Sequence, residues 1–204
     1  MLYDKCALAT NTPRRKRRTT PLDVSSTWLA SVQTFRQTFN LEDKDWKETE
    51  QLKADIKYHL NQNPSSGLTR SLFDRVVKWK LDKQINRPIK FSKTVTNDLV
   101  EKITACAFSL SHTDRYVLAR VRLDTLGALP GVDIGVASAI LALTFPDEYG
   151  VIDPRIWKAM YGEDKTGFSL PNYTMFLGHL LDGASQLKWI AQELDFLTWK
   201  LADK

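Results

Sequence analysis

Apolar residues recur in steps of three and four along most of the chain from Ser25 onward. That spacing places them on one side of a helix, as in amphipathic helices packed on a core. The first two stripes are Trp28, Leu29, Val32, Phe35 and Phe39, and, after Asp45, Leu52, Ile56, His59 and Leu60. We expect Ser25 or Ser26 to cap the first helix, and a turn over 61–67 to follow the second.

The same spacing continues to the end of the chain. Further helices are predicted over Leu68–Leu81, after a cap at Thr96 or Asn97, from Asp114 to Gly127 with Val117, Leu118 and Val121, over Ile134–Phe145, after Asp153, around Tyr173–Leu181, and over Leu187–Leu201, with a loop at Ile85–Lys93. No run alternates with the period of a strand. The sequence therefore predicts an all-α protein of about nine or ten helices.

The positive charge is concentrated in one short segment. Lys and Arg total 29 and Asp and Glu total 24, which gives a net charge of +5. Arg14, Arg15, Lys16, Arg17 and Arg18 supply that whole excess. We predict a flexible basic arm over residues 1–24 that binds phosphate groups without sequence preference, followed by one domain over 25–204. A disordered tail or a localisation signal explains the run equally well.

Several classes of protein are disfavoured by composition. Cys6 and Cys106 are the only cysteines, too few for a disulfide framework or a four-thiolate iron–sulfur cluster. The three histidines lack metal-ligand spacing, so no metal site is predicted. Ile134–Phe145 is too short to span a bilayer, and Met1–Thr10 has no apolar signal-peptide core. We expect a cytoplasmic, nucleoid-associated protein, or a nuclear one in a eukaryote.

The most informative segment begins with a tight turn between two helices, Leu129-Pro130-Gly131-Val132. Gly131 tolerates the positive φ of such a turn, and Pro130 fixes the approach. Small residues at 135 and 137–139 allow close packing of the next helix. The N–H groups at its N-terminus can hold a phosphate, although such a turn also simply joins core helices.

With Ala137 and Ile140 on the following helix and Val151-Ile152-Asp153 after it, this turn resembles the helix-hairpin-helix DNA glycosylase superfamily. The resemblance covers residues 126–157. Within the superfamily, the chain is similar in pattern to the 8-oxoguanine and alkyladenine glycosylases. It implies a two-lobed all-α fold, with lobes over about 25–95 plus 184–204 and over 96–183. A flipped base would enter a cleft between the lobes.

The resemblance also implies roles for particular residues. Asp153 would be the catalytic carboxylate, which stabilises positive charge on the sugar as the N-glycosidic bond breaks. The implied DNA contacts are Pro130, Gly131, Val132, Asp133 and Gly135, together with the basic arm, and the implied base pocket is Asp195, Phe196 and Trp199. Ordinary packing of the last helix also accounts for the pocket residues. The partner would be double-stranded DNA, and the protein would bind it as a monomer. No membrane and no cofactor are expected, although the hairpin could hold a structural monovalent cation.

This chain departs from the family pattern at three positions. Gly135 stands where some members have a Schiff-base lysine, and Lys158 lies about 140° around its helix from Asp153. Asp133 places a carboxylate beside the expected phosphate. Asp153 precedes Pro154, so an N-cap role explains it as well. The cations of the Leu68–Leu81 helix and just beyond are predicted to lie on its solvent side: Arg70, Arg75, Lys78, Lys80 and Lys83.

The leading hypothesis is a monofunctional DNA N-glycosylase that uses water to remove a damaged or modified base. Two alternatives keep the same scaffold without catalysis: a helix-hairpin-helix DNA-binding module and a partner-binding protein. An Asp153 side chain that faces an open cleft would favour the enzyme. A side chain used only for capping, beside a cleft filled by Trp and Phe, would favour the alternatives.

Overall fold

The computed structural model describes residues 24–25, 27–81 and 95–203, and within them it is all-α. The described helices are α1 (Trp28–Thr38), α2 (Lys44–Gln62), α3 (Arg70–Leu81), α4 (Asn97–Ser109), α5 (Arg115–Leu126), α6 (Ile134–Thr144), α7 (Pro154–Tyr161), α8 (Leu170–Leu187) and α9 (Ala191–Ala202). None of these helices has the length and apolar composition needed to cross a membrane. The basic run at 14–18 and the predicted loop at 85–93 lie outside the described residues.

Side-chain caps begin most of the described helices where polar residues precede an apolar stripe. Thr96, one of the two caps predicted for α4, accepts a hydrogen bond from the Leu99 amide at 3.2 Å. Asp43 caps α2, which begins earlier than the predicted start after Asp45. Asp114, where a helix was predicted to begin, is the N-cap of α5. Each cap satisfies N–H groups that have no partner within the helix.

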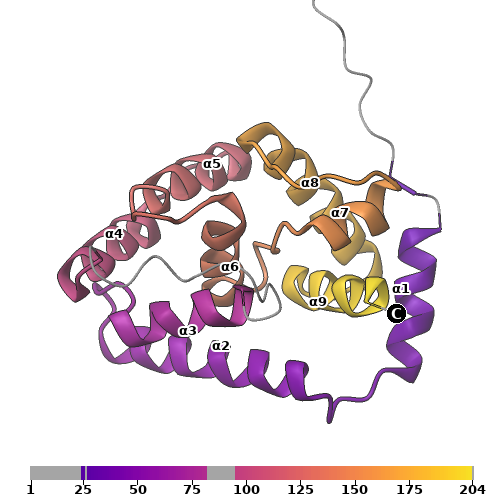
Figure 1. Ribbon diagram of the computed structural model, residues 1–204, viewed down its shortest axis with the longest axis horizontal. Helices are drawn as coiled ribbons and strands as arrows, with labels where there is room; N and C mark the ends of the chain where they lie inside the picture. Colours follow the sequence, from indigo (N-terminus) through magenta and orange to yellow (C-terminus); the bar gives the residue numbers. More distant parts are fainter. Residues whose placement is uncertain (1–23, 26, 82–94, 204) are drawn as a thin grey trace, which may run out of the picture.

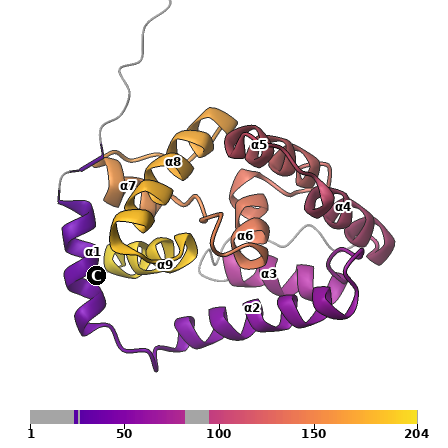
Figure 2. The ribbon, with the colours of Figure 1, turned by 180° about the vertical axis from the view of Figure 1, so that it is seen from behind.

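The apolar helix α6 lies at the centre of the fold (Figures 1 and 2). All its residues from 136 to 143 are buried, because α2, α3, α5 and α9 pack around it. A helix that is apolar on every side is stable only in such surroundings. Helices α2 and α3 also pack on each other, and α4 joins α3 to α5. These contacts form one group of helices around α6.

A second group forms around α9, which packs against α1, α7 and α8. Contacts of α9 with α6 and of α8 with α5 join the two groups. The N-terminal helix α1 therefore packs beside the last helix, whereas α2 and α3 pack on α6. The lobe boundaries given by the resemblance, 25–95 plus 184–204 and 96–183, remain a prediction.

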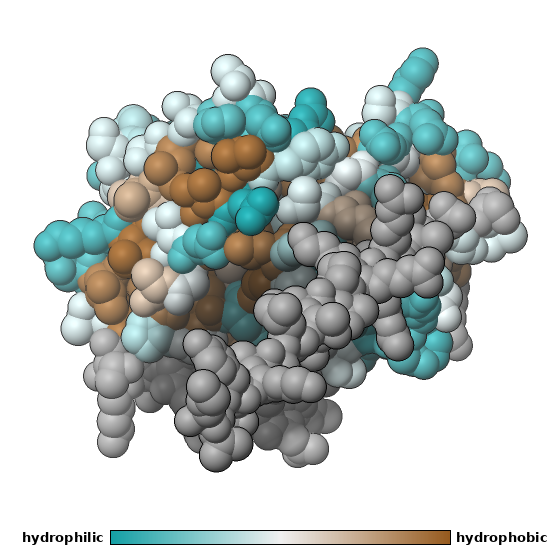
Figure 3. All heavy atoms as spheres, turned by 90° about the horizontal axis from the view of Figure 1, so that it is seen from above, coloured by the Kyte–Doolittle hydropathy of each residue, from teal (hydrophilic) through white to brown (hydrophobic). Residues whose placement is uncertain are grey.

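The buried side of α5 differs from the predicted one. Val117 and Val121 are 38% and 44% exposed, whereas Arg122 is buried. The Arg122 guanidinium donates to the carbonyl oxygens of Phe108 and Leu110 and to the Tyr149 hydroxyl, which compensates for its lost hydration. The stripe predicted from the sequence was wrong, because the buried side of α5 consists of Ala119, Arg122, Leu123 and Leu126. From above, hydrophobic side chains are visible between hydrophilic ones on the surface (Figure 3).

The predicted last helix is interrupted near its start. α8 continues to Leu187, Lys188 has a left-handed conformation with φ 58°, and α9 begins at Ala191. The Trp189 amide donates to the Ala184 carbonyl at 3.0 Å, which ends α8 with a reversal of the chain. Trp189, which was expected on the last helix beside its leucine stripe, therefore lies in the break before that helix.

Candidate active site

The predicted turn between α5 and α6 is present. The Val132 amide donates to the Leu129 carbonyl at 3.0 Å, and Gly131 has φ 82°, which is the geometry expected for Pro-Gly at its centre. Leu129 and Val132 are buried, whereas Pro130 and Gly131 are exposed at the tip. Contact of this tip with DNA remains a prediction.

Asp133 is the N-cap of α6. Its Oδ1 accepts a hydrogen bond from the Val136 amide at 2.9 Å. A phosphate at this N-terminus would need the same kind of N–H group. The carboxylate therefore already supplies the negative charge that the helix terminus favours.

The segment before α7 is fixed against α6 and α8. The Ile152 amide donates to Ser138 Oγ at 3.2 Å, and Ser138 Oγ donates to the Gly135 carbonyl at 2.8 Å. The Tyr173 hydroxyl donates to the Gly150 carbonyl at 3.1 Å. Because residues 150–152 are buried and held from both sides, the position of Asp153 is closely determined.

Asp153 uses its two carboxylate oxygens for different partners. Oδ1 accepts the Arg155 amide at 2.9 Å, so Asp153 is the N-cap of α7. Oδ2 lies 2.8 Å from Lys80 Nζ, and this ion pair is largely buried, with side-chain exposures of 12% and 8%. Lys80 Nζ also lies 3.4 Å from the Ile152 carbonyl oxygen. Capping and an ion pair in the cleft therefore coexist at Asp153.

The ionisation of Asp153 is set by opposing effects. Burial by itself raises the pKa of this carboxyl, but the charge and hydrogen bond of Lys80, with the Arg155 amide and guanidinium, hold the pKa below its ordinary value. Asp153 is therefore negatively charged at neutral pH. Such a buried charge is the type of group that can stabilise a developing cation nearby.

The prediction that Lys80 lies on the solvent side of its helix was wrong. Lys80 follows Phe73, Val76 and Val77 at the spacing of the buried stripe, so the sequence did contain the signal for an inward position. Its Cε is 3.7 Å from the point where a Cβ on Gly135 would lie. The lysine of α3 therefore approaches the space beside residue 135 from another helix. Lys158, by contrast, pairs with Asp164 at the surface.

A cleft of about 180 Å³ opens beside the Lys80–Asp153 pair. Its lining residues are Asp45, Glu48, Trp79, Lys80, Val151, Asp153, Pro154, Arg155, Asp195, Phe196 and Trp199. All three predicted base-pocket residues are among them, and Trp79 was not predicted. Trp79 Nε1 donates to Thr49 Oγ1 at 2.9 Å, which fixes its ring. The cleft therefore combines aromatic walls with charged groups.

Asp195 is buried in the wall of this cleft, with 2% of its surface exposed. Burial raises the pKa of Asp195 well above that of an ordinary carboxyl; the Val151 amide and the Lys80 charge oppose this, and the Asp153 charge adds to it. Burial therefore favours the protonated form of this side chain. Its Oδ1 has no hydrogen-bond partner among the described residues.

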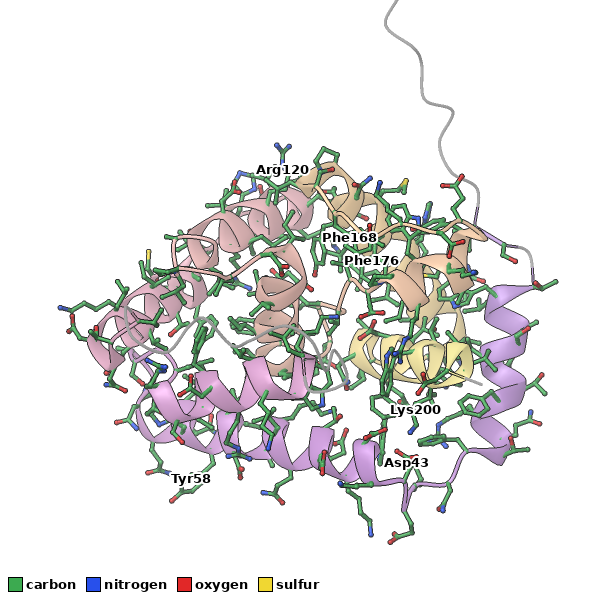
Figure 4. The ribbon with its side chains drawn as sticks, in the orientation of Figure 1. Asp43, Tyr58, Arg120, Phe168, Phe176 and Lys200 are labelled. Atoms are coloured by element: carbon green, nitrogen blue, oxygen red, sulfur yellow. The ribbon has the colours of Figure 1, made fainter. Side chains whose placement is uncertain are left out.

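Further ion pairs join the elements around the cleft. Lys200 of α9 lies 2.7 Å from Asp43 and 2.9 Å from Asp45, which connects α9 to the beginning of α2 (Figure 4). Arg155 pairs with the Asp203 carboxylate at 2.7 Å. The cations nearest the cleft thus already have carboxylate partners, and Asp45 and Glu48 make part of its lining acidic.

In the described part of the chain, no group of three or more His, Cys, Asp or Glu side chains is arranged to hold a metal ion. Comparisons with protein-family models, curated proteins and solved structures gave no match to this chain.

Proposed function

We propose that this protein is a DNA N-glycosylase that removes a damaged or modified base. The observation that supports the proposal best is the cleft, in which the Asp153 carboxylate lies beside aromatic rings that a planar base can stack on. The resemblance supplied Asp153 and the pocket residues from separate parts of the sequence, and the fold brings them to one cavity.

Asp153 would act through its negative charge. Breaking the bond between a base and C1′ of the sugar leaves positive charge on the sugar ring. A carboxylate held in a largely buried position stabilises that charge more strongly than one in water, because the surrounding dielectric is lower. The Lys80 and Arg155 hydrogen bonds keep the carboxylate ionised and fixed in direction.

Lys80 changes the expected nucleophile. Water was predicted because no lysine was expected near Asp153, but Lys80 Nζ lies 2.8 Å from its carboxylate. After losing a proton, this amine can form a bond to C1′ as the base leaves with the bonding electrons and takes up a proton. The sugar ring then opens: the bond from C1′ to the ring oxygen breaks, that oxygen takes up the second amine proton, and an imine remains between Lys80 and C1′. We therefore propose Lys80 as the attacking group, with water as the alternative.

The test is incubation of the full chain with duplexes that each contain one modified base, with and without borohydride. Excision is read as alkali-sensitive abasic sites, and an imine as a covalent protein–DNA adduct. We expect a borohydride-dependent adduct for the native protein and none for Lys80→Met. Lys158→Met is the matched control, because Lys158 pairs with Asp164 outside the cleft, and it should retain the adduct.

The outcomes separate the hypotheses. Abasic sites without an adduct would retain the glycosylase proposal and restore water as the nucleophile, as the sequence predicted. Absence of both across a wide lesion panel would refute the enzyme proposal. Duplex binding without excision would instead favour a non-catalytic DNA-binding module, and absence of duplex binding would favour a partner-binding protein on the same scaffold.

A further inference from the structure

The unpaired oxygen of Asp195 is an unusual feature of the cleft. Oδ1 is buried and lacks a hydrogen-bond partner among the described residues, although the side chain lines the cavity. Buried polar atoms are almost always paired, because they otherwise lose hydration without compensation. A carboxyl retained in this state at the wall of a cavity is therefore placed to meet a polar atom of a bound molecule.

The burial of Asp195 favours its protonated form. A carboxylate that is 2% exposed and has an oxygen without a partner would lose its hydration without compensation, whereas the neutral acid loses far less. A carboxylic acid, unlike a carboxylate, is a hydrogen-bond donor. Asp195 can therefore donate a hydrogen bond to a molecule bound in the cleft that it lines.

The surrounding residues favour a flat ligand. Trp199 follows Asp195 by four residues on α9, so the two side chains lie on the same side of that helix. Phe196 and Trp79 add two further aromatic rings to the lining. A planar heterocycle stacked on these rings would direct its polar edge toward the acid.

We propose that Asp195 is a specificity-determining residue that donates a hydrogen bond to a carbonyl oxygen or an unprotonated ring nitrogen on the base in the cleft. This inference rests on the proposed function and narrows its substrate class. Bases with an acceptor at that edge are favoured, and bases with an exocyclic amino group there are rejected, because two donors would face each other.

The proposal is tested by binding of free bases in matched pairs, hypoxanthine against purine and uracil against pyrimidin-2-one. Quenching of tryptophan fluorescence reports occupancy, since Trp79 and Trp199 line the cleft, and the measurement requires no catalysis. The native protein should prefer the carbonyl-bearing member of at least one pair by about tenfold. Asp195→Asn should keep that preference, because its amide can donate where Oδ1 now lies.

Asp195→Leu has a similar size and no donor, so it should bind both members of the pair about equally, with circular dichroism confirming that it folds. The same preference in Asp195→Leu, no preference in the native protein, or no binding of any base would each overturn the proposal. Excision from the duplex panel is scored separately. Excision with an unchanged preference in Asp195→Leu would refute only the role of Asp195. A preference that depends on Asp195, without excision, would refute only the enzyme.

Discussion

Replacing Asp195 with asparagine should change how the stability of the protein depends on pH. Burial raises the pKa of Asp195 far above its value in an unfolded chain. Between those two pKa values the folded state holds a proton that the unfolded state releases. Stability from this group is therefore fully present below the unfolded pKa of about 3.9, and it is lost as pH rises toward the folded pKa.

The size of the effect follows from the linkage relation. One proton held only by the folded state lowers the free energy of unfolding by about 1.4 kcal/mol for each pH unit. Asp195→Asn removes the titrating group but preserves the shape of the side chain. While the pH lies between the two pKa values, the native protein should therefore lose up to about 1.4 kcal/mol relative to the variant for each pH unit. Other groups near Asp195, which include Lys80, Asp153 and Tyr173, are common to both proteins.

The assay is urea unfolding at pH 5, 6 and 7, followed by circular dichroism. Asp195→Leu also lacks the titrating group, so its curve should run parallel to that of Asp195→Asn. Asp182→Asn, at an exposed position of α8, controls for the loss of one negative charge. Parallel curves for the native protein and Asp195→Asn across this range would show that Asp195 ionises as freely in the folded state as in the unfolded chain. Asp195 would then not be a protonated acid in the cleft.

Three other perturbations test different parts of the structure. Asp153→Asn should keep the α7 cap but leave the buried Lys80 charge unpaired, which should lower the free energy of unfolding in urea by about 3 kcal/mol. Adding Lys80→Met should recover most of that loss. Additive losses from the two substitutions would contradict a coupled pair. Gly150→Ala should lower the free energy of unfolding by about 1–3 kcal/mol in thermal or urea unfolding, because the added Cβ would lie 2.1 Å from Leu180 Cδ2. The control Gly127→Ala should be tolerated, because no atom lies closer than 3.4 Å to its added Cβ. Equal effects of the two substitutions would argue against the close approach at residue 150. Deleting residues 1–20 removes the five clustered cations. In a plot of log affinity for duplex DNA against log salt concentration, the slope should become shallower by up to about 4.5. An unchanged slope would show that the arm does not contact phosphates.

The sequence was most informative where local rules determine the structure. The turn at Leu129–Val132 depends on Pro130 and a glycine with positive φ, and both are visible in four letters. The apolar stripe of α3 likewise predicted the buried face of that helix, and the apolar segment at α6 predicted a helix. The break between α8 and α9 was missed because the leucine spacing continues across it, and a left-handed lysine gives no sequence signal.

The candidate site was harder to predict because its central interaction joins residues 73 positions apart. A charged residue is normally assigned to the solvent side of a helix, since burying an isolated charge is costly. That rule fails for Lys80 because α3 ends beside Ile152 and Asp153. There the Asp153 carboxylate and the Ile152 carbonyl accept hydrogen bonds from the Lys80 ammonium group. Arg122 of α5 violates the same rule for the same reason, with three oxygen acceptors around its guanidinium. For Lys80 the predicted apolar spacing was informative and the chemical type of the residue was misleading, whereas for α5 the predicted stripe itself was on the wrong side of the helix. A lysine or arginine at a stripe position is therefore better treated as a candidate buried cation whose partner must be sought elsewhere in the chain.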